Sequence, residues 1–204
     1  MSNSSASFDI LGQTGRRWTQ REIVIVAALG VVFAVLYLAW VQVWLAAQAA
    51  IGPLALDVLF GFWCVASVIA AYVIRKPFAA LSAEVIAAAA EILAGNPAGL
   101  ILLLTGVVQG AGAELPFALT KWRNYRLPVL LASGASAAVF SFVYTWIRFS
   151  YGTLKPSLLI AMFALRVVSG VVLAGWLGGR IAEALYRTGV LQGLGIDAAK
   201  RGQA

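Results

Sequence analysis

The sequence contains no histidine and a single cysteine, Cys64. Zinc sites are built mainly from cysteine and histidine ligands, and the common catalytic triads use a histidine base, so sites of both kinds are excluded. One cysteine also excludes a disulfide bond within the chain. The phosphate-binding pattern GxxxxGK[ST] is absent, so the chain does not bind ATP through that motif. These absences predict a protein without a metal ion, a cofactor or catalytic residues of its own.

Charged residues are also scarce. They make up 11% of the 204 residues, whereas hydrophobic residues make up 62%. A soluble domain carries roughly a quarter charged residues, so this composition excludes an ordinary water-soluble fold. The polar N-terminal stretch contains no apolar core, so we expect no cleavable signal peptide. The chain is therefore predicted to be an integral membrane protein.

Six apolar segments are long enough, or nearly so, to cross a bilayer as helices of roughly 20 residues. They cover residues 23–45, 58–74, 78–94, 98–119, 127–147 and 157–179. The third is short and rich in alanine, and a Lys-Pro and an Asn-Pro pair mark its two ends. We therefore predict an all-α bundle of six transmembrane helices over residues 22–187, with polar tails over 1–21 and 188–204.

Basic residues are distributed unequally between the predicted loops. Only Arg148 and Lys155 lie in loops on one side of the membrane, and Arg166 lies inside the last span. The other twelve lysines and arginines lie on the opposite side. Cytoplasmic loops carry the excess of Lys and Arg, so both termini are predicted to be cytoplasmic, in a multi-pass protein of the cell membrane. The net charge of +7 then reflects topology, and no nucleic-acid partner is expected.

Four ionisable residues fall within the predicted spans, namely Glu84, Glu91, Glu114 and Arg166. Ionisable groups at membrane depth are costly and rare without a role. Two interpretations are open for Glu84 and for Glu114, either contact with a ligand or a structural role, in which Glu114 and Arg166 form an ion pair between helices. Glu91 follows Glu84 by two helical turns on nearly the same face and lies near the external side. The outer loops beside Glu91 contain no basic residue that could pair with it. Glu91 therefore indicates a binding site for a cationic or amine-bearing ligand.

Aromatic residues gather at a similar depth, among them Trp40, Trp63 and Tyr144. Tryptophan and tyrosine commonly form belts at the membrane interfaces, which is the simplest interpretation of each one. Together they also provide flat faces and cation–π contacts for a charged ring. Both interpretations are open.

The first predicted span carries a pair of small residues, Gly30 and Ala34, at a spacing of four. Small residues at this spacing allow two membrane helices to approach closely. The pair is explained either by packing within the chain or by the docking of another membrane subunit.

Five short stretches resemble one family in order along the chain. They are "IRKPFAALSAEVIAAAAEILAGNPAG", "GVVQGAGAELPF", "KWRNYRLPVLLASG", "LRVVSGVVLAGWLG" and "TGVLQG". Together they are similar to the YkoE family, the substrate-binding S components of energy-coupling-factor (ECF) vitamin importers. The resemblance extends from about Glu22 to Gly193.

This resemblance implies a six-helix membrane protein with a ligand pocket toward the external face. The implied ligand is thiamine or its hydroxymethylpyrimidine precursor. The implied partners, besides the lipid bilayer, are a transmembrane coupling subunit and two cytoplasmic ATPase subunits, which would explain the missing ATP-binding motif. The chain would then be a non-catalytic subunit of an ATP-driven importer of the ABC type.

The resemblance also implies roles for individual residues. Glu91 and Glu84 would bind the aminopyrimidine edge, and the aromatic faces would lie against the thiazolium ring. Gln109 and Asn96 would supply further hydrogen bonds. Docking of the coupling subunit in such proteins generally uses an Ala-xxx-Ala pattern on the first helix; here Gly30 and Ala34 stand in that place.

Two other functions are compatible with parts of the sequence. A self-sufficient proton-coupled carrier of a small cationic metabolite would use Glu84, Glu91 and Glu114 as a relay, but no internal repeat of the kind common in such carriers is evident. An intramembrane enzyme would need a nucleophile beside a base, and no such pair occurs at a useful spacing.

Overall fold

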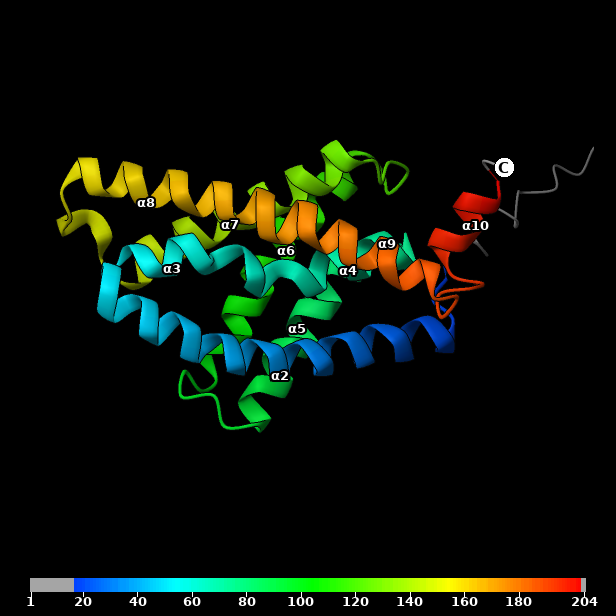
Figure 1. Cartoon of the computed structure of the whole chain (residues 1–204), viewed down its shortest axis with the longest axis horizontal. Coiled ribbons are helices and arrows are strands. Elements are labelled where there is room, and N and C mark those ends of the chain that lie inside the picture. Colours follow the sequence, from blue (N-terminus) through cyan, green and yellow to red (C-terminus); the bar gives the residue numbers. More distant parts are fainter. Residues whose placement is uncertain (1–16, 203–204) are drawn as a thin grey trace, which may run out of the picture.

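The computed structural model describes residues 17–202, in which all the regular elements are helices and no strand occurs (Figure 1). The elements are α2 (Gln20–Ile51), α3 (Leu54–Leu59), η1 (Phe60–Cys64), α4 (Val65–Ile74), α5 (Ala79–Leu93), α6 (Ile101–Leu119), α7 (Leu127–Arg148), η2 (Tyr151–Thr153), α8 (Pro156–Ser169), η3 (Gly170–Leu177), α9 (Gly178–Arg187) and α10 (Gly195–Arg201). Two longer rods each contain a break: α3, η1 and α4 form one, and α8, η3 and α9 form the other.

Five helical stretches in the described part are long and apolar enough to cross a membrane. They are Gln20–Ile51, Leu54–Ile74, Ile101–Leu119, Leu127–Arg148 and Pro156–Arg187. Each corresponds to one of the predicted spans. The remaining prediction, residues 78–94, forms α5, whose 15 residues are fewer than the roughly 20 that a straight crossing requires.

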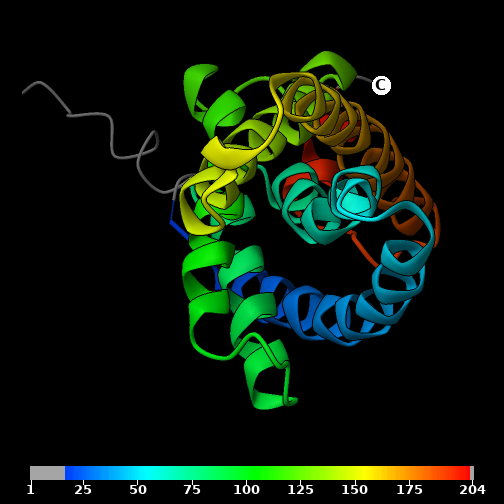
Figure 2. The ribbon, with the colours of Figure 1, turned by 90° about the vertical axis from the view of Figure 1, so that its left-hand side faces the viewer.

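α4 lies inside a ring formed by the other long helices (Figure 2). All of its residues except Tyr72 are buried. Its sequence, VASVIAAYVI, is apolar on every side apart from Ser67, which is the pattern of a helix surrounded by others. α5 packs against α2, α4 and α6, and its alanines allow these helices to approach closely.

Gly30 and Ala34 belong to the contact between α2 and α5. Both are buried, and a Cβ atom added at Gly30 would lie 2.7 Å from Cγ2 of Ile86. The two residues are therefore occupied by packing within the chain. The expectation that they form an exposed docking stripe is wrong, because both are buried and Gly30 packs against Ile86 of α5.

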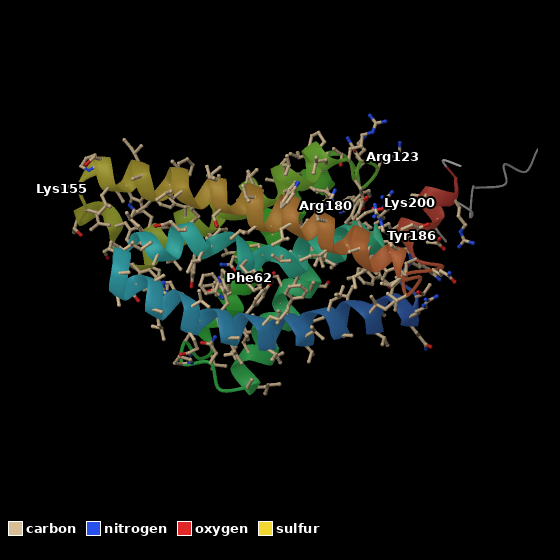
Figure 3. The ribbon with its side chains drawn as sticks, viewed as in Figure 1. Phe62, Arg123, Lys155, Arg180, Tyr186 and Lys200 are labelled. Carbon is tan, nitrogen blue, oxygen red and sulfur yellow. The ribbon has the colours of Figure 1, made fainter. Side chains whose placement is uncertain are left out.

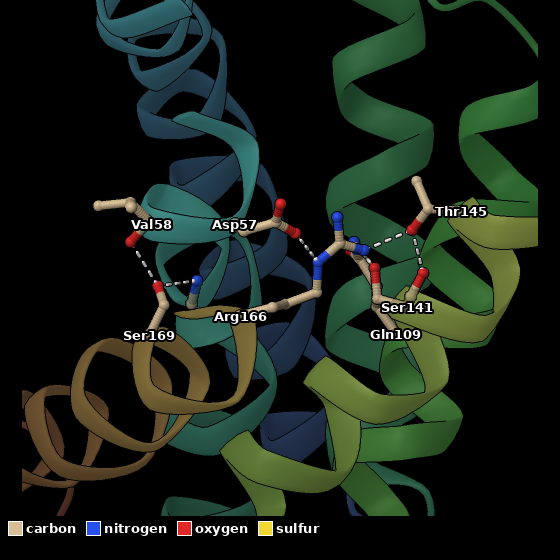
Figure 4. Close-up of polar contacts among 8 residues, drawn as sticks. Asp57, Val58, Gln109, Ser141, Thr145, Arg166 and Ser169 are labelled. Carbon is tan, nitrogen blue, oxygen red and sulfur yellow. Dashed lines mark hydrogen bonds and ion pairs between the residues drawn. The ribbon is translucent and has the colours of Figure 1, made fainter. Parts of the chain in front are cut away.

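The breaks in the two long rods face each other. η1 is a 3₁₀ helix and η3 is a π-helix, a form found mostly in short pieces and frequently near functional sites. The hydroxyl of Ser169, the last residue of α8 before η3, donates to the carbonyl of Val58 in α3 at 2.7 Å and accepts from the N–H of Gly61 in η1 at 2.9 Å (Figure 4). This bridge holds the end of α8 against α3.

The start of α2 is tied to the turn between α4 and α5. Thr19 and Glu22 form a capping box, in which each accepts a hydrogen bond from the other's backbone N–H. Lys76 forms an ion pair with Glu22 at 2.8 Å, and Trp18 Nε1 donates to the carbonyl of Pro77 at 3.2 Å. These contacts place the beginning of the described chain beside the α4–α5 turn.

The end of the described chain is folded rather than extended. Leu191, Leu194 and Ile196 are buried in the core cluster that includes Ile74. α10 therefore lies at the same end of the molecule as the start of α2 (Figure 1). Arg123, Arg180 and Lys200 also lie toward this end, whereas Lys155 lies at the opposite end (Figure 3).

Candidate ligand-binding site

A cavity of about 420 Å³ lies between the helices. Its walls come from α2, the α3–η1 rod, α5, α6, α7 and α8, together with the loop after α5. Six of the seven predicted ligand-binding residues line it, namely Trp63, Glu84, Glu91, Asn96, Gln109 and Tyr144. The cavity contains groups of both charge signs and several aromatic rings, so it is suited to a small, ring-containing polar ligand.

The seventh predicted residue, Trp40, does not line the cavity. Its Nε1 donates to the carbonyl of Leu59 at 3.2 Å, and its ring stacks on Phe62 with 4.3 Å between centroids. Trp40 therefore fastens α2 to the start of η1. The structure does not place it among the residues that line the cavity, where it was expected.

The two acids on α5 are buried, with 3% of Glu84 and 4% of Glu91 exposed. Each is held by a neutral donor: the Ser67 hydroxyl donates to Glu84 at 2.5 Å, and Asn96 Nδ2 donates to Glu91 at 2.8 Å. Within residues 17–202, neither carboxyl group forms an ion pair. The seven-residue spacing brings both to the same wall, because seven residues make about two helical turns.

Asn96 has a second role at the end of α5. Its Oδ1 accepts from the N–H of Ala98 at 2.9 Å, and its own N–H donates to the carbonyl of Glu91 at 2.9 Å. The "GNP" sequence thus closes the helix and turns the chain directly over the cavity. As a result, the side-chain amide of Asn96 is fixed beside the Glu91 carboxyl group.

The wall formed by α6 and α7 carries polar groups that are only loosely paired. Gln109 Nε2 lies 3.4 Å from Ser141 Oγ, and Thr105 Oγ1 lies 3.4 Å from the Tyr144 hydroxyl. Both distances exceed the usual range, which is about 2.7–3.2 Å for N–H···O bonds and about 2.5–3.0 Å for O–H···O bonds, so these groups retain the capacity to bind a ligand.

Aromatic rings complete the lining. Besides Trp63 and Tyr144, the cavity is bordered by Trp44, Phe60 and Phe149. Their faces can stack on a flat ring, and electron-rich faces attract a cation. The distribution of aromatic residues in the sequence indicated such a group but not which of its members reach the cavity.

Arg166 also borders the cavity, and its partner differs from the predicted one. Arg166 Nε donates to Asp57 Oδ1 at 2.6 Å (Figure 4). The rings of Phe60 and Phe142 lie against the guanidinium group at 5.4 Å and 5.3 Å from their centroids. Asp57 is one residue before the predicted second span, so the sequence pattern assigned it to a loop.

Glu114 instead caps the beginning of α5. It accepts from the backbone N–H groups of Phe78 at 2.8 Å and of Ala80 at 2.9 Å, and from Trp122 Nε1 at 2.5 Å. The first N–H groups of a helix have no partner within the helix and carry a partial positive charge, which a carboxylate satisfies. The predicted Glu114–Arg166 pair is therefore wrong, and Glu114 has a structural role away from the cavity lining.

The acidic residues do not form a metal site. Within residues 17–202, no three Asp, Glu or Cys side chains are grouped so that they could hold a metal ion. The chemistry available in the cavity is hydrogen bonding, charge and stacking.

The comparisons with known proteins agree with this arrangement. Residues 21–140 match the family described as "ABC-type cobalt transport system, permease component". The chain is 42% identical over 181 residues to the HMP/thiamine permease protein YkoE of Bacillus subtilis (strain 168), covering 89% of this chain and 91% of that protein. It also resembles a solved structure described as the crystal structure of an S-component of an ECF transporter, with a TM-score of 0.88 and 41% identity. That match covers 92% of this chain and 95% of the other.

The similarities to this relative and to this solved structure extend over nearly the whole chain. At 42% and 41% sequence identity, these matches show membership of the same family and not only a shared fold. The proteins matched are permease components, which are non-catalytic subunits of transporters. The chain therefore belongs to the YkoE family of ECF-transporter S components.

Proposed function

We propose that this protein captures thiamine or its hydroxymethylpyrimidine precursor for an ATP-driven ECF importer. The observation that carries the proposal is the pair of buried acids, Glu84 and Glu91, on one wall of a cavity bordered by aromatic rings. Neutral Ser67 and Asn96 are their hydrogen-bond partners in the described chain, so an amine or a cationic ring would supply the missing positive partner. The similarity to a protein named as an HMP/thiamine permease supports the same ligands.

In this proposal the aminopyrimidine edge lies against α5. Glu91 and Glu84 accept hydrogen bonds from the amine and the ring, and Asn96 and Gln109 add further polar contacts. Trp63 and Tyr144 provide stacking faces for the ring system. Hydrogen bonds that involve a charged group are about twice as strong as neutral ones, so Glu91 and Glu84 would contribute most to the affinity.

The proposed topology has six crossings with both termini in the cytoplasm of the cell, and α5 is the shortest crossing. The end that carries Arg123, Arg180 and Lys200 would face the cytoplasm, as the positive-inside rule requires (Figure 3). The cavity, bordered by Arg148 and Phe149 at the far end of α7, would then open toward the outside.

The proposed partners are a transmembrane coupling subunit and two ATPase subunits. ATP hydrolysis by the partners would drive the reorientation that releases the ligand inside, since the described chain holds no phosphate-binding loop of the GxxxxGK[ST] type. Because Gly30 and Ala34 are buried, docking would use another surface.

Titration of the purified protein with thiamine and with hydroxymethylpyrimidine tests the proposal. Trp44 and Trp63 line the cavity, so tryptophan fluorescence should change saturably when a ligand binds. The change should occur without ATP, partner subunits or a proton gradient. No response to either compound would contradict the vitamin assignment.

The proton-coupled carrier is less well supported than capture. A relay of three acids needs Glu114, and Glu114 is held by backbone and indole N–H groups outside the cavity lining. Uptake by vesicles that contain this chain alone, driven by a proton gradient, would favour the carrier. We expect no such uptake.

A further inference from the structure

Three hydrogen-bonding side chains form a cluster on the cavity wall that α6 and α7 provide. They are Thr105 on α6 and Tyr144 and Arg148 on α7, and each of them lines the cavity. Thr105 Oγ1 lies 3.4 Å from the hydroxyl oxygen of Tyr144, and Arg148 Nη1 lies 3.5 Å from the same oxygen. We call these three residues the donor cluster.

The fold leaves most of the donor capacity of this cluster unused. Both contacts with the Tyr144 oxygen are longer than a usual hydrogen bond. Thr105 Oγ1 can also donate to the carbonyl of Ile101, at a long 3.3 Å. Within residues 17–202 the Tyr144 hydroxyl accepts these contacts but donates to no acceptor of its own. The donor cluster can therefore bind an acceptor that enters the cavity.

Arg148 supplies an accessible positive charge at this wall. It is exposed, and no carboxylate of the described residues lies within ion-pair distance of it. Its guanidinium carbon lies 5.0 Å from the ring centre of Phe149 and 5.9 Å from that of Tyr144. The other arginine in the lining, Arg166, is buried and already paired with Asp57. Arg148 is thus the lining cation that can exchange water for a ligand group.

The composition of the donor cluster favours a phosphate group as its ligand. A guanidinium group matches phosphate through two parallel N–H groups. A phosphate ester also presents three strong acceptor oxygens, which the hydroxyls of Tyr144 and Thr105 can share with Arg148. A neutral acceptor would leave the charge of Arg148 without a partner, and a carboxylate has only two oxygens for the three donor residues.

The donor cluster complements the acids on another wall. Glu84 and Glu91 reach the cavity from α5, whereas the donor cluster belongs to α6 and α7. The acids suit an amine and the donor cluster suits an anion, so one ligand satisfies both when it carries an amine and a phosphate at separate positions. The cavity volume of about 420 Å³ is sufficient for a small ring with a phosphate substituent.

We infer that the cavity takes the phosphate ester of its amine-bearing ring compound and that Arg148 binds the phosphate. The hydroxyls of Tyr144 and Thr105 add two further donors. This inference rests on the proposed function and deepens it. It names the phosphorylated compound as the preferred ligand, and it names Arg148 as the residue that determines this preference.

The test compares hydroxymethylpyrimidine with its phosphate ester on matched variants. Both compounds are titrated by calorimetry against the wild type, Arg148→Gln and Lys155→Gln. The wild type should bind the ester at least about tenfold more tightly, as expected for hydrogen bonds from a charged donor. In Arg148→Gln the preference should fall below about threefold. Lys155 is also exposed but lies outside the cavity lining, so Lys155→Gln removes the same charge and should retain the preference.

The salt dependence separates a role of the charge from a change in the shape of the cavity. Because Arg148 is exposed, raising the salt concentration should reduce the preference of the wild type for the ester and should change that of Arg148→Gln little. Inorganic phosphate should compete with the ester, and it should not strengthen the binding of the unphosphorylated compound.

Several outcomes would overturn the inference. They are equal binding of both compounds by the wild type, a preference that Arg148→Gln retains, and a preference that does not depend on salt. Stronger binding of hydroxymethylpyrimidine in the presence of inorganic phosphate would also overturn it, because phosphate would then bind as a separate ion. Failure of the wild type to bind either compound would instead overturn the proposed function.

Discussion

Asp57 and Arg166, which are 109 residues apart in the chain, form an ion pair in the interior, with 2.6 Å between Asp57 Oδ1 and Arg166 Nε. Their side chains are 0% and 1% exposed. The pair joins α3 to α8 at the edge of the cavity, next to the Ser169 bridge that joins the same two rods. It therefore connects the stability of the bundle to the shape of the candidate binding site.

Replacing Asp57 by alanine should destabilise the protein strongly. Breaking a buried ion pair leaves an uncompensated charge, which costs roughly 3–5 kcal/mol. Unfolding of the purified protein in a fixed detergent gives the difference in free energy of unfolding. The control is Glu183→Ala, which breaks the partly exposed Lys200–Glu183 pair and should cost less than about 1 kcal/mol. Equal costs for the two variants would contradict the role assigned to Asp57.

Glu91→Gln should weaken the binding of the amine-bearing ligand by roughly 10- to 100-fold, because it replaces a charged acceptor with a neutral one. The carboxamide is close in shape to the carboxyl group and can still bond to Asn96, so the fold should be retained. Equilibrium titration by calorimetry measures the change in Kd. Glu183→Gln, far from the cavity lining, is the matched control. An unchanged Kd for Glu91→Gln would show that Glu91 has only a structural role.

Glu114→Gln should lower stability without removing ligand binding. The variant loses the negative charge at the start of α5, and one amide oxygen must replace two carboxylate oxygens. We expect a loss of about 1–3 kcal/mol, from the weakened cap and the disturbed hydrogen bonds. Thermal unfolding and ligand titration are measured on the same sample. Normal stability combined with lost transport would instead support the proton relay.

Asp197 should make the attachment of α10 sensitive to acid. The backbone N–H of Gly193 donates to its carboxyl group at 2.6 Å, and together with the guanidinium of Arg201 it lowers the pKa below the ordinary value of 3.8. A carboxyl group whose pKa is lowered by folding stabilises the fold above its unfolded pKa. That contribution is lost as the pH falls through the folded pKa.

The comparison of wild type with Asp197→Asn tests this pH dependence. The wild type should have the higher Tm at pH 6, and the difference should shrink steadily as the pH is lowered below about 4. A difference that is constant between these pH values would show that the charge of Asp197 contributes nothing.

The sequence predicted the long helices well because a bilayer imposes a length and composition that can be read locally. Glu84 and Glu91 were found for a related reason: a carboxyl group inside an apolar segment is conspicuous, and their spacing fixes a common face. Asn96 was expected at the site from the family resemblance, and the "GNP" sequence indicated only where the helix ends.

The partner of Arg166 could not be found in this way. The choice between Asp57 and Glu114 depends on which helices are neighbours, and α8 contacts α3 rather than α6 over this region. Asp57 also lies in the first turn of the short helix α3. The sequence of such a short helix does not differ clearly from that of a loop, so the pattern placed Asp57 in a loop. The same limitation applies to Gly30 and Ala34, because a small-residue pattern marks close packing without naming the partner.

Trp40 illustrates a different limit. Trp40 and Trp44 are four residues apart, so they lie on nearly the same face of α2, one turn apart along its axis. Trp40 stacks on Phe62, whereas Trp44 lines the cavity. Which of the two reaches the cavity depends on the side chains of other helices that pack beside each turn. The breaks at η1 and η3 are equally non-local, since the Ser169 hydroxyl beside them joins the two rods across 111 and 108 residues.

We propose that the cavity between α5 and α8 captures the amine-bearing vitamin or its precursor. An experimental structure of the purified chain with hydroxymethylpyrimidine bound would test this proposal without relying on variants. We expect one ligand in this cavity, with its amine within hydrogen-bonding distance of Glu91 or Glu84 and its ring against the aromatic lining. A ligand bound elsewhere, or one in the cavity with its amine turned away from both glutamates, would show that these acids do not capture the amine.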